Sequence, residues 1–366
     1  MQRPNLDARS LALLASVTFG LAAGVGLVIR GGGERSAPAV VTPTQFEPVS
    51  AADSVQRGGE ARLGRGTWSG PIQPIPDLSD YDVARADLGQ RLFHDSRLSK
   101  DGTISCASCH DIASGGADGL QYSIGVGGAV GGINAPTVIN ARFNFRQFWN
   151  GRARDLRTQV DGPLLHPAEM ATTWGEVIAT LNSDASYVSA FQSAYGHGPD
   201  ANSVRDAIAT FEMSLITPDC DFDRWLMGDD SAISEVAKAG FELFVNIGCI
   251  TCHQGVNVGG NMFQPFGKGS SYFDERGGEI TDADLGRFSV TGDERDRHTF
   301  RVAPLRNVAV TAPYMPDGSA ETLADAVQIL ARHQLGEELT GDEVAMIVAF
   351  LETLTGDIQA LAEKGR

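Results

Sequence analysis

Two stretches of the chain repeat the pattern Cys-x-x-Cys-His, at residues 106–110 and 249–253. Two thiols three positions apart can add across the two vinyl groups of one porphyrin, and the histidine that follows is then held beneath the iron as an axial ligand. Zinc ribbons also use Cys-x-x-Cys pairs, but they do not require the two fixed histidines. We therefore predict two covalently bound haem c groups. Their attachment residues are Cys106, Cys109, His110, Cys249, Cys252 and His253.

The elements that must position these motifs occur in the same order around each motif, so the chain contains two similar segments, which we call the first and the second pass. A short amphipathic segment with the pattern Gly-x-x-Leu-Phe precedes each motif, at residues 89–93 and 240–244. Apolar residues at helical spacing close each pass, at 204–215 and 344–351, and Thr340 with Glu343 predicts a capping box before the latter. We expect a mainly α fold with two cytochrome c-like domains, each with one covalent haem, joined by extensive loops with few strands.

The 366 residues are enough for about two domains beyond a leader. Residues 11–29 carry no charge and lie between Arg9 and Arg30, which favours an N-terminal membrane anchor within residues 1–30 over a cleaved signal peptide. Either reading places the remaining chain outside the cytoplasm. Residues 31–75 are predicted to be a flexible linker, followed by domains at 76–230 and 231–366.

The net charge of −17 argues against nucleic acid as a partner, because phosphates would repel such a surface. It permits steering of a basic protein partner, or it serves solubility alone. The remaining thiol, Cys220, has no partner cysteine, and we expect it to play no part in the chemistry.

Two haems in one chain allow two classes of function. In an electron carrier, strong ligands saturate both irons, whereas in a redox enzyme one iron keeps an open position for a small oxidant and the other relays electrons. Acid–base residues at the open position would distinguish the two classes.

The segments between and after the two motifs resemble the bacterial dihaem cytochrome c peroxidases and a related enzyme, which matures methylamine dehydrogenase. The resemblance covers roughly residues 80 to 356. It is carried by an ordered set of short motifs at residues 134–137, 147–153, 159, 162–163, 167–170, 305–307, 311–314, 317–319 and 334–336.

The resemblance implies a peroxidatic haem on His110 and an electron-transferring haem on His253. Glu169 matches the family's distal carboxylate, which can take a proton from bound peroxide and return it to the departing oxygen. Gln159, with Pro163, would line the same pocket. Trp149 matches the tryptophan that lies between the haems.

The same resemblance implies a calcium ion between the domains. Its ligands would be the side-chain amide of Asn134 and the backbone carbonyls of Thr311 and Pro313, and oxygen ligands of this kind suit calcium.

The sequence departs from the family at both distal positions. Val126 stands where many of these peroxidases carry a histidine that blocks the peroxidatic iron, which predicts a haem that is open without reductive activation. Leu330 stands where the other haem usually has a methionine or tyrosine ligand. That iron is then five-coordinate, or His333 or Met315 replaces the ligand. Three histidines remain as alternative ligands of the first iron: His94, His166 and His197.

The resulting hypothesis is a periplasmic dihaem peroxidase, tethered to the inner membrane by residues 11–29. It would reduce hydrogen peroxide to water with electrons from a small cytochrome c, cupredoxin or quinol-linked donor. The alternatives are a maturation-type enzyme that uses peroxide to oxidise a protein side chain, and a non-catalytic dihaem electron carrier. The resemblance also suggests a homodimer.

Overall fold

The computed structural model describes residues 69–364, so the predicted anchor (residues 11–29) and most of the predicted linker lie outside the described residues. All of the described residues fall within one compact unit. Within residues 69–364, none of the helices combines the length and the apolar character needed to cross a bilayer.

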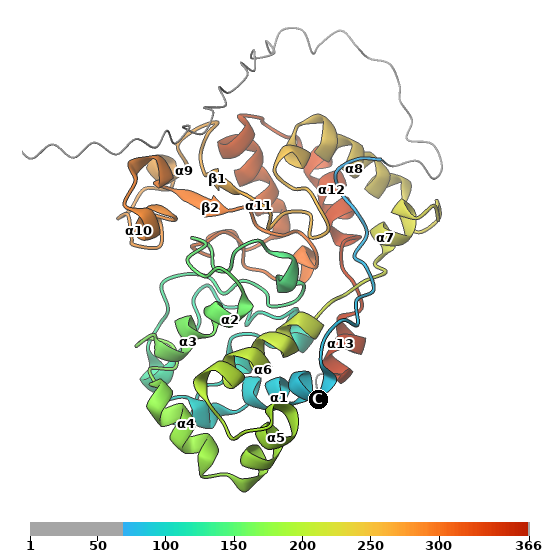
Figure 1. The fold of residues 1–366 in the computed structure, drawn as a ribbon. Helices are drawn as coiled ribbons and strands as arrows, with labels where there is room; N and C mark the ends of the chain where they lie inside the picture. Colours follow the sequence, from blue (N-terminus) through green and yellow to red (C-terminus); the bar gives the residue numbers. More distant parts are fainter. Residues whose placement is uncertain (1–68, 365–366) are drawn as a thin grey trace, which may run out of the picture. The chain divides into compact units, whose positions relative to one another are not determined.

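Helices and loops make up nearly all of the structure, which confirms the mainly α prediction (Figure 1). The α-helices are α1 (Val83–Phe93), α2 (Leu156–Gln159), α3 (Asp161–Leu165), α4 (Trp174–Asn182), α5 (Ala185–Tyr195), α6 (Ala201–Ser214), α7 (Asp221–Leu226), α8 (Glu235–Asn246), α9 (Tyr272–Arg276), α10 (Phe288–Thr291), α11 (Leu323–Leu330), α12 (Gly341–Glu352) and α13 (Ile358–Lys364). The strands β1 (Phe263–Pro265) and β2 (Thr299–Arg301) pair antiparallel.

Short helical turns interrupt the loops. The 3-10 turns are Ser96–Leu98, Cys106–Ser108, Ile112–Ser114, Val126–Gly128, Ala141–Phe143, Cys249–Thr251, Glu294–Asp296 and Val308–Val310, and a π-helical turn, Ala331–Leu335, follows α11.

The helix before each haem motif packs against the helix that closes the same pass. In Figure 1, α1 lies beside α6 and α8 lies beside α12. A Cβ atom on Gly89 would lie 1.9 Å from the carbonyl oxygen of Ala207, and one on Gly240 would lie 1.8 Å from that of Met346. Only glycine allows this approach, so the repeated Gly-x-x-Leu-Phe pattern marks the point where each helix pair is in closest contact.

The closing helices begin where the sequence indicates. Thr340 accepts a hydrogen bond from the backbone N–H of Glu343, whose carboxylate accepts from Thr340 in return, so the predicted capping box is present at α12. Asp200 caps α6 in the same way with Ser203. Both helices are therefore held at their N-termini by side chains that compensate for unpaired backbone donors.

The first hydrophobic core gathers the apolar faces of α1, α4, α5 and α6. Leu92, Phe93 and Val204 are fully buried there. Leu361 and Ala362 of α13 complete this core, although they come from the end of the chain.

A second hydrophobic core, built on α7, α8 and α12, contains an aromatic cluster. The rings of Phe222, Phe241 and Phe350 lie 5.0 to 5.1 Å apart between centroids. Ile72 belongs to this core, and both Ile72 and Ile75 are buried. The packed chain thus begins before residue 76, the limit that the sequence indicated for the linker. The domain limit near residue 230 stays a prediction.

Candidate active site

Each Cys-x-x-Cys-His motif folds as one tight turn. The 3-10 turns Cys106–Ser108 and Cys249–Thr251 begin at the first cysteine of each motif. The backbone N–H of His110 donates to the carbonyl of Cys106 at 3.0 Å, and that of His253 donates to the carbonyl of Cys249 at 3.0 Å. The turn brings two thiols and one imidazole together, as one porphyrin requires.

The two histidines are held by the same device. The Nδ1 atom of His110 lies 3.2 Å from the carbonyl oxygen of Gly116, and Nδ1 of His253 lies 3.2 Å from that of Val258. A carbonyl accepts only from a protonated Nδ1, which leaves Nε2 free as a metal ligand. Burial lowers the pKa of His110, and it lowers that of His253 to about 4. Both imidazoles are therefore neutral and fit an iron ligand.

The attachment thiols fit a thioether better than a thiolate. Burial raises the pKa of Cys106 and of Cys249 to about 12. It also raises the pKa of Cys109 and of Cys252. A buried thiolate is unfavourable, whereas a thioether carries no charge. These surroundings favour haem attachment over a zinc–thiolate site.

Glu169 follows α3 in a tight turn, where its N–H donates to the carbonyl of His166 at 3.0 Å. Its side chain is half-buried, and Oε1 lies 3.4 Å from His166 Nδ1. Burial raises the pKa of Glu169, while the charges of His166 and Arg152 oppose that rise. A carboxyl group in such surroundings can exchange a proton closer to neutral pH than an ordinary glutamate.

Val126 lies directly against the backbone of Glu169. The N–H of Val126 donates to the carbonyl of Glu169 at 2.9 Å. A Cβ on Gly125 would lie 2.0 Å from the carbonyl oxygen of Ala168, so the two segments touch backbone to backbone. Val126, predicted to stand at the position of the family's blocking histidine, is thus hydrogen-bonded to the backbone of Glu169, the predicted distal carboxylate, and it has no atom that binds iron.

Gln159 and Pro163 lie close to Glu169 along the chain, in α2 and α3. Phe148 packs its own loop against this region, because a Cβ on Gly162 would lie 2.5 Å from the Phe148 ring. The Arg152 guanidinium stacks on the same ring, with its Cζ 3.4 Å from the centre of the Phe148 ring. The structure therefore joins the motif that carries Trp149 to the segment that carries Glu169.

The three alternative histidines occupy different places. His94 directs Nδ1 to the carbonyl of Gln90 at 2.9 Å, and His197 pairs with Asp200 at 3.5 Å. Both are exposed. Of the three, only His166 contacts Glu169, the predicted distal carboxylate.

Trp149 links segments from the two passes. Its Nε1–H donates to the carbonyl of Asn134 at 2.9 Å, and its own carbonyl accepts from the N–H of Arg301 at 2.8 Å. The ring packs against a small aromatic cluster that includes Phe273 and Phe300. Two backbone anchors and this packing fix the indole in place.

The predicted calcium ligands lie on loops that meet. The N–H of Asn134 donates to the carbonyl of Pro316 at 2.8 Å, and its side-chain Nδ2 donates to the carbonyl of Leu120 at 3.0 Å. Within residues 69–364, no donor is hydrogen-bonded to the carbonyl oxygens of Thr311 or Pro313. These oxygens fit a calcium ion.

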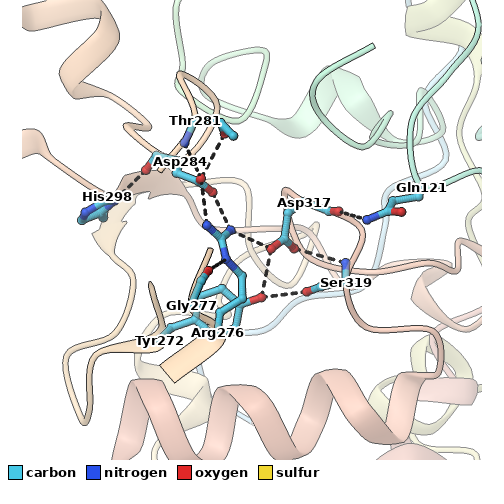
Figure 2. Close-up of polar contacts among 9 residues, drawn as sticks. All are labelled: Gln121, Tyr272, Arg276, Gly277, Thr281, Asp284, His298, Asp317 and Ser319. Carbon is cyan, nitrogen blue, oxygen red and sulfur yellow. Dashed lines mark hydrogen bonds and ion pairs between the residues drawn. The ribbon is translucent and has the colours of Figure 1, made fainter. Parts of the chain in front are cut away.

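A charged network holds the loop that follows Pro313 (Figure 2). Arg276 contacts both oxygens of Asp284, at 2.7 and 2.9 Å, and Asp317 at 2.9 Å. Tyr272 donates to the same Asp317 carboxylate at 3.1 Å, and Gln121 donates to its backbone carbonyl at 3.0 Å. Burial alone would raise the pKa of Asp284, but the hydrogen bonds from Arg276 and Thr281, together with the charge of Arg276, outweigh it and lower that pKa. The network ties the loop to both passes of the chain.

The two candidate ligands of the second iron have different surroundings. His333 is buried with Nδ1 2.9 Å from the hydroxyl of Ser270 and Nε2 3.8 Å from Glu275. Met315 is also buried, and it packs in one cluster with Leu330. Met315 thus packs beside Leu330, the predicted ligand position, whereas His333 contacts Ser270 and Glu275.

Sequence reasoning missed two buried charged groups. Glu212 is 4% exposed with no partner for Oε2, and burial raises its pKa to about 8. Glu212 lies four residues after Ile208 on the apolar face of α6, and this spacing could have indicated that it is buried. Arg301 is 2% exposed with no partner for Nη1, and no pattern in the sequence marks it.

A family model for di-haem cytochrome c peroxidases matches residues 83–231. A cytochrome c551 peroxidase of Nitrosomonas europaea is 44% identical over 78% of this chain and 84% of its own length, and one of Pseudomonas aeruginosa is 44% identical with the same coverage. The chain belongs to the di-haem cytochrome c peroxidase family. It is an oxidoreductase of the cytochrome c peroxidase type.

Other members of the family show different degrees of similarity to this chain. A cytochrome c peroxidase of Escherichia coli is 49% identical over 78% of this chain, which spans 61% of that protein. A methylamine utilisation protein of Methylorubrum extorquens is more distant, at 31% over 79% of the chain and 83% of its own length. Among solved structures, a MauG-like protein associated with microbial copper homeostasis superposes with a TM-score of 0.70 at 28% identity, over 81% of this chain and 97% of the other.

Proposed function

We propose that the protein binds haem c at His110 and at His253 and reduces hydrogen peroxide at the His110 haem. The observation that carries the proposal is the half-buried Glu169, whose pKa is raised and whose backbone holds Val126. When bound, the haem supplies an iron that takes up peroxide and accepts electrons.

Glu169 acts as the proton carrier of the site. The reduction uses hydrogen peroxide, two electrons and two protons and yields two water molecules. Glu169 accepts the proton of the peroxide oxygen nearest the iron and delivers it to the departing oxygen. The charges of the nearby His166 and Arg152 oppose the effect of burial on the pKa of Glu169 and favour the ionised carboxylate, which is the form that a base needs.

The first iron has no side-chain ligand from residue 126, because valine offers no donor atom. An iron held by His110 would then be open to peroxide without prior reduction of the second haem. A maturation-type reaction on a protein side chain is the second candidate, and Val126 is the observation that favours it. The greater distance of the methylamine utilisation proteins counts against it.

Trp149 would lie on the electron path between a haem bound at His253 and one bound at His110. The two backbone anchors of Trp149 keep its ring in a fixed position, which suits an electron path. Met315 is the better candidate for the sixth ligand of the second iron, because it packs beside Leu330. A calcium ion bound by Asn134, Thr311 and Pro313 steadies the loops on either side.

The proposed setting follows from the leader and the haem chemistry. The protein works in the periplasm, tethered to the inner membrane by residues 11–29, and it takes electrons from a small cytochrome c or a cupredoxin. It forms a homodimer, as the family resemblance suggests.

A substitution pair tests the proposal. Glu169→Gln should lower the rate of peroxide reduction by roughly 10²- to 10⁴-fold, because a general acid–base group is lost. Glu242→Gln, an exposed site on α8, makes the same change of charge and should leave the rate unchanged. Stopped-flow turnover with a reduced small cytochrome c gives the rates, and absorbance gives the haem content.

A spectrum of the oxidised protein separates the alternatives. Electron paramagnetic resonance should show one high-spin haem before any reduction, and slow turnover with cytochrome c would favour the maturation-type reaction. Two low-spin haems, with full activity in Glu169→Gln, would overturn the proposal and leave a different site for the chemistry.

A further inference from the structure

Arg301 is a buried cation without an anion. It is 2% exposed at the end of β2, and its Nη1 has no hydrogen-bond partner. Its Nε contacts the carbonyl of Phe148 at a long 3.4 Å. Among the described residues, no carboxylate lies within ion-pair distance of this guanidinium. A buried, unpaired charge is strongly unfavourable, so an anion from outside the polypeptide is needed.

Arg306, five residues on, shows how the same fold treats a buried arginine that is purely structural. It is 1% exposed and pairs with the buried carboxylate of Asp223 at 2.7 Å. Its other donors reach the carbonyls of Val256 and Gln73, each at 3.0 Å. Every direction of that guanidinium is used within the chain. Arg301 lacks an equivalent of Asp223, which marks it as a different kind of group.

The position of Arg301 indicates which anion it meets. Its N–H donates to the carbonyl of Trp149, and Ala303, two residues later, makes a backbone interaction with the His253 ring. A Cβ on Gly259 would lie 2.2 Å from the carbonyl oxygen of Ala303, so this segment is packed tightly against the loop after the second haem motif. Arg301 thus lies between Trp149 and the second attachment site.

We propose that Arg301 binds a carboxylate side chain of the His253 haem and favours the reduced form of that haem. This proposal rests on the proposed function for the haem at His253. A planar guanidinium suits a carboxylate, with which it can form two parallel hydrogen bonds. The burial that leaves Arg301 unpaired within the chain lowers its pKa to about 10, and a carboxylate partner would keep it charged.

When it pairs with this carboxylate, the Arg301 guanidinium places a fixed positive charge beside the haem that relays electrons. A cation there stabilises the reduced iron, which carries one positive charge fewer than the oxidised iron. The same residue holds the backbone of Trp149. Arg301 is therefore a positioning residue with two effects. It holds the backbone of Trp149 in the electron path, and it raises the reduction potential of the haem at His253.

Three variants test the proposal by reduction potential and vibrational spectrum, which do not depend on peroxide turnover. Arg301→Gln should lower the equilibrium constant for reduction of one haem about tenfold, or about 59 mV for a one-electron couple. It should also shift the propionate bending band of that haem in resonance Raman spectra. Arg301→Lys keeps the positive charge but loses the planar pair of guanidinium donors. It should therefore shift the Raman band and change the reduction potential much less than Arg301→Gln does.

The control is Arg295→Gln, which removes the same charge from a side chain that is 90% exposed and should change neither readout. Unchanged potentials and bands in Arg301→Gln would overturn the proposal, even if Glu169→Gln behaves as expected. If Arg301→Gln does not incorporate haem, Arg301→Lys decides by its band alone: an unshifted band overturns the proposal.

Discussion

The loops that follow the two haem motifs do the same work with different residues. After the first motif, Gly116 has a φ of 75° and its carbonyl accepts from His110; after the second, Val258 has a φ of 49° and its carbonyl accepts from His253. A glycine adopts this left-handed conformation freely, whereas a β-branched residue is strained in it. Val258 is fully buried in the second core, and that burial offsets the strain.

The buried charges of the two passes differ in sign. Beside the first motif lies the unpaired acid Glu212, which interacts with Cys106, and beside the second lies the unpaired cation Arg301. One fold plan thus surrounds its two attachment sites with opposite electrostatics. The comparison teaches that, on the proposed function, the unequal roles of the two haems depend on a few buried side chains, because the helices around the two attachment motifs are alike.

The largest effect expected at any single pH tests whether the two helix pairs, α1 with α6 and α8 with α12, pack alike. Gly89→Ala and Gly240→Ala should each lower the free energy of unfolding by about 3 kcal/mol, because the new Cβ meets a backbone carbonyl that cannot move away cheaply. Gly132→Ala, where a Cβ meets nothing within 4 Å, is the control. Urea unfolding measures all three. A small effect at only one of the two sites would show that the passes pack differently.

The next prediction concerns the acid of the first pass. The pKa of Glu212 is raised to about 8 in the folded protein, from an ordinary value near 4.5. Its contribution to stability is thus fully present below pH 4.5 and is lost as pH rises through 8, by roughly 1.4 kcal/mol per pH unit in that window. Glu212→Gln should remove this slope.

The measurement is the urea unfolding midpoint of the haem-loaded protein at several pH values between 5 and 8. Glu242→Gln is the control, because it removes an exposed carboxylate of the same kind and should keep the slope. An unchanged slope in Glu212→Gln would mean that this acid already has a partner in the haem-loaded protein.

The smallest expected effect concerns the two loops whose carbonyls, from Gly116 and Val258, accept hydrogen bonds from His110 and His253. Gly116→Ala should destabilise the fold by about 1–2 kcal/mol, because alanine is strained at a φ of 75° and its Cβ would lie 2.7 Å from Thr137 Oγ1. The moved carbonyl should also weaken the hydrogen bond to His110 and raise the potential of the first haem. Val258→Ala keeps the left-handed backbone, so the second potential should stay constant. Redox titration checks both, and equal shifts would contradict the distinction.

The sequence was enough to predict the elements whose period or motif is local. Short-range patterns predict the helices of both passes, the capping box at Thr340 and the family, because apolar spacing and helix caps involve residues that are close in sequence. Glu169 and Val126 followed from a resemblance, and the structure brings their backbones together.

The rest depends on contacts between distant segments. Nothing near Arg276 in the sequence indicates that it would bridge Asp284 and Asp317, and nothing near Arg301 indicates that it would lack a partner. The burial of Ile72 and Ile75 was not predicted either. A Pro- and Gly-rich stretch is typical of a linker, and only the folded structure shows that its apolar residues pack in a core.

The place of α13 has a consequence for the order of events during synthesis. Leu361 and Ala362 complete the first core, and α13 packs on the turn Ile112–Ser114 directly after His110 (Figure 1). These residues leave the ribosome long after the first attachment motif. The core around that motif therefore stays incomplete until α13 has been made and has reached the compartment in which haem is attached, and we expect its two thiols to remain accessible to the haem-attachment machinery until then.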